Sequence, residues 1–173
     1  ATVCETLGLS PFGSASVPAD DEAKAVVARQ AGALVVDVLS RGLRPRQIIT
    51  KESIENAIAS VAATGGSTNA VLHLLAIANE AGVALDIDDF DRVSTRTPLI
   101  ADLKPGGRFV ANDLHRAGGV PLVIQRLADA GLLHKDAITI SGKTIGEHAR
   151  EASETAGQQV VRPVNNPLKP TGG

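Results

Sequence analysis

Hydrophobic and polar positions follow a helical period along most of the chain. Between residues 50 and 65 the apolar side chains recur every three to four positions, and Thr50 precedes them where a helix N-cap belongs. A second run of this kind follows Gly65 and Gly66 and stops at Gly82, a residue typical of a helix C-cap. These patterns predict helices as the main secondary structure.

Six more helices and three extended segments complete the expected order of elements. The expected helices cover residues 1–8, 20–41, 88–93, 112–118, 121–131 and 145–153, in addition to the two above. The segments 98–103, 137–140 and 160–162 are extended and are candidates for strands. Residues 31–39 are apolar on nearly all sides, so we expect burial against several neighbours. The pattern therefore predicts a helix-dominated chain with two or three short strands.

Composition narrows the classes of protein to consider. The chain has 173 residues, of which 43% are hydrophobic, which suits one domain with one sizeable core. It carries no apolar run of about 18 residues and no polybasic patch, so we expect neither a membrane partner nor a nucleic-acid partner. Its one cysteine, Cys4, excludes an internal disulfide and favours a reducing, cytoplasmic location. An organellar matrix or stroma is the equivalent location in a eukaryote.

Both ends of the chain have the character of truncation points. The chain contains no Met and opens on residues 1–8 in helical register, without a cap before them. It closes on Lys169-Pro170-Thr171-Gly172-Gly173, a turn with no element after it. We therefore expect residues 1–173 to be an internal piece of a longer protein.

Several candidate sites have simpler explanations. Ser141-Gly142-Lys143-Thr144 ends like a phosphate-binding loop, but that motif needs glycine where the chain has Ala137. Cys4 has no basic neighbour to activate it, so we expect a small buried side chain. His73 has no orienting carboxylate nearby in the sequence, so we expect it to pack in the core.

The candidate binding residues are Gly66, Ser67, Thr68 and Asn69. Glycine permits a turn in which the backbone approaches a ligand, and Ser67, Thr68 or Asn69 can cap the helix that follows. The N-terminus of a helix attracts anions through its free N–H groups and its dipole. A simple connection between two core helices explains the same residues, and spacing alone does not separate these interpretations.

The chain resembles the dihydroxy-acid dehydratases and their sugar-acid dehydratase relatives over nearly its whole length. The matching segments, in the family's order, are LGLSPFGSA (7–15), TKESIENAI (50–58), GGSTNAVLHLLAIA (65–78), ADLKPGGR (101–108), DLHRAGGVP (113–121) and NPLKPTGG (166–173). Within the family, Ala70 and the 101–105 run are most similar to dihydroxy-acid dehydratase. The resemblance implies a partial N-terminal domain of α/β class, without the β-rich C-terminal domain.

The resemblance also implies an activity and its cofactors. The family removes water from a 2,3-dihydroxy carboxylate to give a 2-oxo acid, a reaction of branched-chain amino-acid synthesis. An iron–sulfur cluster and Mg²⁺ act as Lewis acids in the complete, homodimeric enzyme. The cluster cysteines, the magnesium ligands and the serine base match no position here, so we assign no catalytic or metal residue within 1–173.

Two other functions remain open. One is a sugar-acid dehydratase of the same family, such as an aldonate or 6-phosphogluconate dehydratase, which substrate trials on the complete enzyme would distinguish. The other is a non-catalytic helical module that binds an anion or a protein. Cysteine motifs encoded upstream of residue 1 would exclude the second alternative.

We predict that the 173-residue chain by itself binds no iron–sulfur cluster and dehydrates no substrate. A single cysteine supplies one thiolate, whereas such clusters are held by several. Reconstitution with iron and sulfide, followed by visible absorbance and an oxo-acid assay, measures both properties. A stoichiometric cluster on this chain would contradict the interpretation that residues 1–173 are an internal piece without the cluster ligands.

Overall fold

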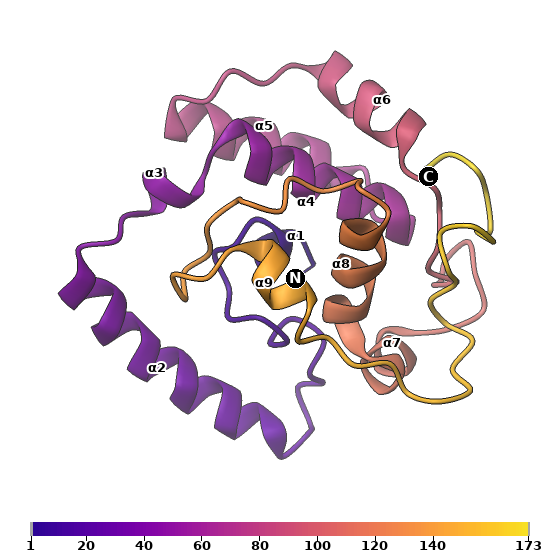
Figure 1. The fold of residues 1–173 in the computed structure, drawn as a ribbon, viewed down its shortest axis with the longest axis horizontal. Helices are drawn as coiled ribbons and strands as arrows, with labels where there is room; N and C mark the ends of the chain where they lie inside the picture. Colours follow the sequence, from indigo (N-terminus) through magenta and orange to yellow (C-terminus); the bar gives the residue numbers. More distant parts are fainter. Residues whose placement is uncertain (1, 173) are drawn as a thin grey trace.

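The computed structural model describes residues 2–172 and folds them mainly into helices. These are α1 (Thr2–Thr6), α2 (Ala23–Arg41), α3 (Pro45–Ile48), α4 (Lys51–Thr64), α5 (Asn69–Ala81), α6 (Ile87–Arg96), α7 (Ala111–Ala117), α8 (Gly119–Asp129) and α9 (Ile145–Ala149). Figure 1 shows α4 and α8 near the middle of the molecule and α2 along one side of it.

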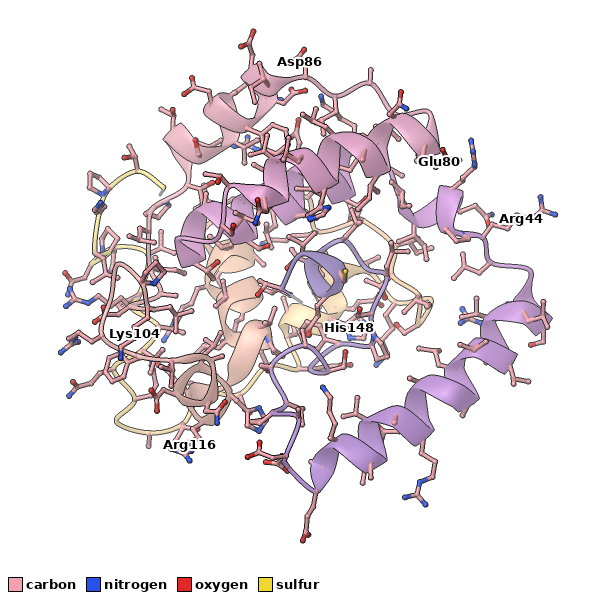
Figure 2. All side chains as sticks on the ribbon, turned by 180° about the vertical axis from the view of Figure 1, so that it is seen from behind. Arg44, Glu80, Asp86, Lys104, Arg116 and His148 are labelled. Atoms are coloured by element: carbon pink, nitrogen blue, oxygen red, sulfur yellow. The ribbon has the colours of Figure 1, made fainter. Side chains whose placement is uncertain are left out.

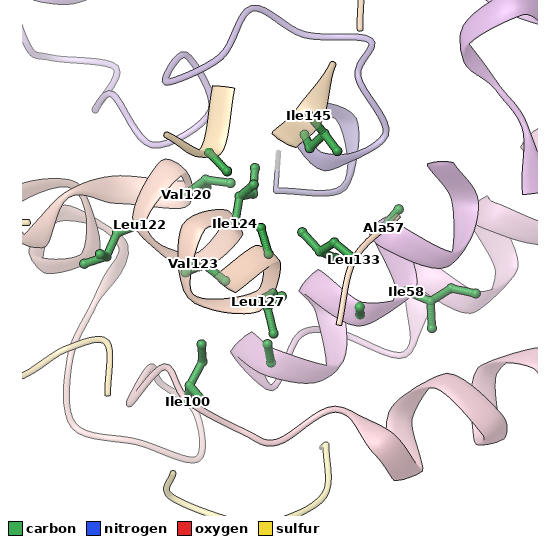
Figure 3. Packing of buried hydrophobic residues seen from close by; sticks show 14 of the residues in the cluster. Ala57, Ile58, Ile100, Val120, Leu122, Val123, Ile124, Leu127, Leu133 and Ile145 are labelled. Carbon is green, nitrogen blue, oxygen red and sulfur yellow. The ribbon is translucent and has the colours of Figure 1, made fainter. Parts of the chain in front are cut away.

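Helix α4 lies at the centre of the core. From Ser53 to Thr64 only Val61 is not fully buried. Its small residues, among them Ala57, Ala59 and Ala63, let α1, α6 and α8 pack closely around it. Figure 3 shows side chains of α4, α8 and the segment at Ile145 meeting in one cluster, which is the main hydrophobic core of the described residues.

Several helix ends are held by cap residues close to them in the sequence. The Thr50 hydroxyl accepts a hydrogen bond from the Ser53 N–H, and the Ser53 hydroxyl accepts one from the Thr50 N–H. Thr144 and Glu147 form the same reciprocal pair at α9. Gly42, Gly65 and Gly82 take the left-handed conformation after α2, α4 and α5. The helix boundaries that the sequence predicts at Thr50, Gly65 and Gly82 are confirmed, because each depends on residues within one helical turn.

Two helices begin earlier in the structure than the sequence pattern predicts. Helix α6 begins after Asp86, whose carboxylate accepts the N–H groups of Asp88 and Asp89. Helix α7 begins after Val110, and Asp113 accepts the Val110 N–H from within the first turn instead of preceding the helix. Runs of Asn and Asp offer several equivalent caps, and packing selects among them. The short helix α3 was not predicted.

The predicted strands are wrong: residues 2–172 form no sheet and contain only isolated bridges between single residue pairs. The segment 98–103 bonds instead to the end of α4, where the Ala63 carbonyl accepts the N–H groups of Ile100 and Ala101. Segment 137–140 bonds to nearby turns, and Val161 of segment 160–162 bridges only to Ala101. Each extended segment makes single hydrogen-bonded contacts instead of a continuous ladder. The described residues are therefore helical and not α/β.

Helix α2 is exposed, contrary to the burial expected for residues 31–39. None of its residues is fully buried, and Val35, Val36 and Leu39 are 62%, 68% and 80% exposed. Its ribbon lies apart from the other helices (Figure 1). An apolar helix without neighbours leaves a hydrophobic surface uncovered. None of the helices within residues 2–172 has the length and apolar character needed to cross a bilayer.

The loop from Ala101 to Phe109 closes on a buried carboxylate. Asp102 is 5% exposed, and it accepts hydrogen bonds from the Arg108 N–H (3.0 Å) and the Arg108 guanidinium (2.5 Å). These hydrogen bonds hold the pKa of Asp102 below its usual range, with the guanidinium contributing most. Gly107 passes against Asp102, and a Cβ there would lie 2.6 Å from the Leu103 nitrogen.

We predict that Gly107→Ala destabilises the protein by about 1–3 kcal/mol, because the added methyl overlaps backbone that cannot move aside. Gly106→Ala is the matched control, since a Cβ at 106 would meet no atom within 4 Å. Urea unfolding of the two variants measures the difference. Equal stabilities would mean that the loop relaxes freely around Asp102.

Candidate functional site

The glycine loop, defined as residues 65–69, connects α4 to α5 at the surface. Gly65 ends α4 in the left-handed conformation (φ 58°), and the Gly66 N–H donates to the Val61 carbonyl. The Ser67 hydroxyl accepts the Asn69 N–H at 3.2 Å and so caps the first turn of α5. Thr68 occupies the N-cap position, but its side chain makes no capping hydrogen bond. The structure therefore assigns the cap to Ser67 and leaves the Thr68 side chain uncommitted.

The loop presents hydrogen-bonding groups to solvent. All four candidate residues, Gly66 to Asn69, are exposed. Neither the Ser67 nor the Thr68 backbone N–H donates to another group of residues 2–172. These N–H groups lie at the positive end of the 13-residue helix α5. The arrangement can accept a carboxylate or a hydroxyl group.

A cavity of about 320 Å³ opens on one side of the glycine loop, between α4, α5 and α6. Gly66, Ser67 and Thr68 form a polar edge, and α6 adds the polar residues Asp91 and Ser94. Most of the remaining wall is apolar and includes Ile58, Val71, Leu74, Ile87 and Phe90. A ligand with a polar head and an aliphatic body would match this lining.

A second cavity, of about 530 Å³, lies on the other side of the same loop, between α1, α4 and α5. Gly66, Ser67 and Asn69 line it together with Cys4 and His73. Both Cys4 and His73 are exposed, so the expectation that they are buried is wrong. Both side chains are exposed because they lie on the faces of α1 and α5 that point away from the core.

The α6 wall of the first cavity is held by charge pairs. Asp89 accepts hydrogen bonds from Lys51 and from Arg92, and these lower its pKa to about 2. Burial would raise the pKa of Glu55, but hydrogen bonds from Arg92 (2.7 Å) and His134 (2.8 Å) outweigh burial and leave it lowered. Both carboxylates therefore stay ionised at neutral pH and keep α6 against α4.

Sequence reasoning missed a polar cluster away from the glycine loop. His148 is buried, and its ring lies 2.8 Å from the Ser141 hydroxyl and 3.2 Å from the Glu151 carboxylate. Phe12 stacks on the ring with centroids 4.7 Å apart. Ser141 also contacts Thr139 and the Lys143 N–H, so its hydroxyl is fully engaged in the turn before α9. No local pattern predicts the cluster, because the partners meet only in the folded chain.

No group of three metal-ligating side chains comes together in the part of the chain that the structure describes. The acidic residues around α6 serve as caps and ion pairs instead.

The chain belongs to the dihydroxy-acid/6-phosphogluconate dehydratase family, whose N-terminal domain profile matches residues 1–148. The resemblance found in the sequence motifs is therefore confirmed. Its relatives include proteins named dihydroxy-acid dehydratase. The one from Koribacter versatilis is 63% identical over 169 residues, covering 98% of this chain and 30% of the relative.

Two further relatives carry the same name. The protein from Roseiflexus sp. is 58% identical over the whole chain, which covers 31% of it. The protein from Sulfurisphaera tokodaii is 52% identical over 171 residues, which are 98% of this chain and 30% of the relative. The chain thus spans about a third of the length of the relatives that it matches.

We predict that Ser67→Ala costs about 0.5–1 kcal/mol of stability, because it removes the cap from the first turn of α5. Thr68→Ala should stay within about 0.5 kcal/mol of the wild type, since no capping hydrogen bond is lost. Urea unfolding of both variants tests the assignment. A larger loss of stability for Thr68→Ala than for Ser67→Ala would contradict the assignment of the cap to Ser67.

Proposed function

We propose that this chain is part of a hydro-lyase that dehydrates a 2,3-dihydroxy carboxylic acid to a 2-oxo acid. In this reaction the hydroxyl at C3 leaves, C2 loses a proton, and the resulting enol becomes the 2-oxo group. The proposal is supported by membership of the dehydratase family and by the names of the relatives. The enzyme would act in the cytoplasm in branched-chain amino-acid synthesis.

The observation that carries the proposal is the glycine loop between its two cavities. Gly66, Ser67, Thr68 and Asn69 would form part of the substrate-pocket wall. The open N–H groups of Ser67 and Thr68, at the start of α5, suit the substrate carboxylate. The Thr68 hydroxyl, which caps nothing, is available for a substrate oxygen.

The lining of the first cavity supports a branched aliphatic substrate over a sugar acid. Beyond the polar edge at Ser67 and Thr68, its wall is formed largely by side chains such as Leu74, Ile87 and Phe90. The hydroxyl groups of a sugar acid would lose hydrogen bonds to water against this wall, which costs free energy. A methyl-branched chain gains from the same contact.

The residues of this chain do not fit the cofactors that the family resemblance implies. An iron–sulfur cluster needs several thiolates, and the chain supplies only the exposed Cys4. The described residues also bring together no three carboxylate or imidazole ligands for a metal ion. The role of this chain in the reaction is therefore to bind and orient the substrate, with the iron–sulfur cluster and Mg²⁺ held by other parts of a homodimeric enzyme.

We predict that Thr68→Ala lowers kcat/KM at least tenfold, about 1.4 kcal/mol, with little change in melting temperature. The measurement uses the complete enzyme with its cofactors loaded and a branched 2,3-dihydroxy acid as substrate. Thr95→Ala is the control, because Thr95 is an exposed threonine of α6 that does not line either cavity. If Thr68→Ala leaves kcat/KM unchanged, the glycine loop only connects two helices and does not bind the substrate.

A further inference from the structure

A third cavity, of about 290 Å³, lies between the loop that carries Arg108 and the chain segment 154–166. It shares no lining residue with the two cavities beside the glycine loop. Six of the eight residues that line it are polar, and two of these are the arginines Arg108 and Arg162. Its volume is at the lower end of the range of small-molecule sites, which begins at about 300 Å³.

Backbone hydrogen bonds bring the two arginines to this cavity from distant parts of the sequence. The Arg162 N–H donates to the Ile100 carbonyl, and the Asp102 N–H donates to the Val160 carbonyl, both at 2.8 Å. Figure 1 shows the C-terminal segment, in yellow, beside the segment that follows α6. These bonds fix the backbone of Arg162 next to the loop of Arg108.

The Arg108 guanidinium is held in place along one edge only. Its Nε donates to the Asp102 carboxylate at 2.5 Å, and its central carbon lies 4.9 Å from the centroid of the Phe109 ring. Among the described residues, neither Nη atom of Arg108 has a hydrogen-bond acceptor. A guanidinium that is already positioned loses little side-chain entropy when these remaining N–H groups bind a ligand.

The Arg162 side chain is half-buried and has no acceptor for its guanidinium within residues 2–172. Its charge adds to the lowering of the pKa of Asp102, after the larger effect of the Arg108 hydrogen bond. The guanidinium therefore lies within electrostatic range of Asp102 and near the Arg108 side chain, where two positive charges favour an anion between them.

The carboxylates near the cavity do not cancel this charge. Asp102 is paired with Arg108, and Glu154 accepts a hydrogen bond from Arg126 at 2.6 Å. With Arg162 included, three guanidinium groups accompany two carboxylates. The cavity thus keeps an excess positive charge.

The remaining polar groups indicate the chemistry of a ligand. Guanidinium N–H groups match the geometry of phosphate oxygens, and a phosphate group offers enough oxygens to bind two guanidinium groups at once. The amides of Gln159 and Asn166 are exposed, line the same cavity and make no side-chain hydrogen bond in the described part of the chain. Amides of this kind bind hydroxyl groups.

We propose that this cavity binds a small hydroxylated phosphate monoester, with its phosphate group between Arg108 and Arg162 and its hydroxyl groups near Gln159 and Asn166. The site is separate from the glycine loop, so its ligand is an effector and not the molecule that is dehydrated. The proposal goes beyond the proposed function and does not depend on it.

Calorimetric titration of the complete polypeptide with glycerol 3-phosphate tests the site. Arg162→Gln should raise the Kd at least tenfold and change the melting temperature little, because its guanidinium holds no other part of the described chain. Arg108 is less informative as a variant, since it also closes the loop on Asp102.

Arg44→Gln is the matched control, because it removes the same charge elsewhere. Figure 2 shows Arg44 projecting from the molecule on the side away from Lys104, which lies in the Arg108 loop. We expect this variant to keep the Kd within twofold of the wild type at constant ionic strength. An equal loss of affinity in both variants would show attraction by net charge alone and would overturn the proposal.

Two further ligands separate the parts of the monoester. Inorganic phosphate should bind more weakly than glycerol 3-phosphate, and Asn166→Ala should weaken only the monoester. Glycerol should show no saturable binding. Absence of saturable glycerol 3-phosphate binding at millimolar concentrations, unchanged affinity in Arg162→Gln, or inorganic phosphate binding as tightly as the monoester would each overturn the proposal. The readout is heat of binding, so its outcome is independent of the Thr68 kinetics.

Discussion

The rest of the structure depends on the burial of α4. A helix enclosed on nearly every side must satisfy its polar side chains without water, since an unpaired buried group costs about 1–3 kcal/mol. Asn56 does so by exchanging hydrogen bonds with the backbone of His134 (3.0 and 2.7 Å), and Glu55 does so with Arg92 and His134. These bonds bring His134, 78 positions after Asn56, and Arg92, 37 positions after Glu55, to one helix and position the elements around it.

The position of the glycine loop follows from this constraint. Helix α4 leaves the core at Gly65, where its last carbonyls are shared between the loop and the segment at Ile100. The loop therefore lies where the packed core ends, and open space remains on both of its sides. A rigid buried helix before the loop and the regular helix α5 after it hold the loop backbone in one conformation, as a binding surface requires.

Much of the helical order and the candidate loop could be predicted from the sequence. Thr50, Thr144 and the glycines after α2, α4 and α5 act on residues within one helical turn. A short sequence segment is therefore enough to predict their effect. The roles of Ser67 and Thr68 could not be separated, because either hydroxyl has the right spacing. Cys4 and His73 were misplaced because the sequence pattern does not show which face of α1 or α5 is covered.

The sequence by itself determined the helices, their caps and the family motifs, because these depend on neighbouring residues or on the identity of short segments. Only the tertiary structure decided what the extended segments pair with. Ile100 bonds to Ala63 at the end of a helix, and segments 98–103 and 160–162 meet only around the single Ala101–Val161 bridge, so no sheet forms. An extended backbone needs partners for its N–H and C=O groups, and the fold, not the local pattern, chooses those partners.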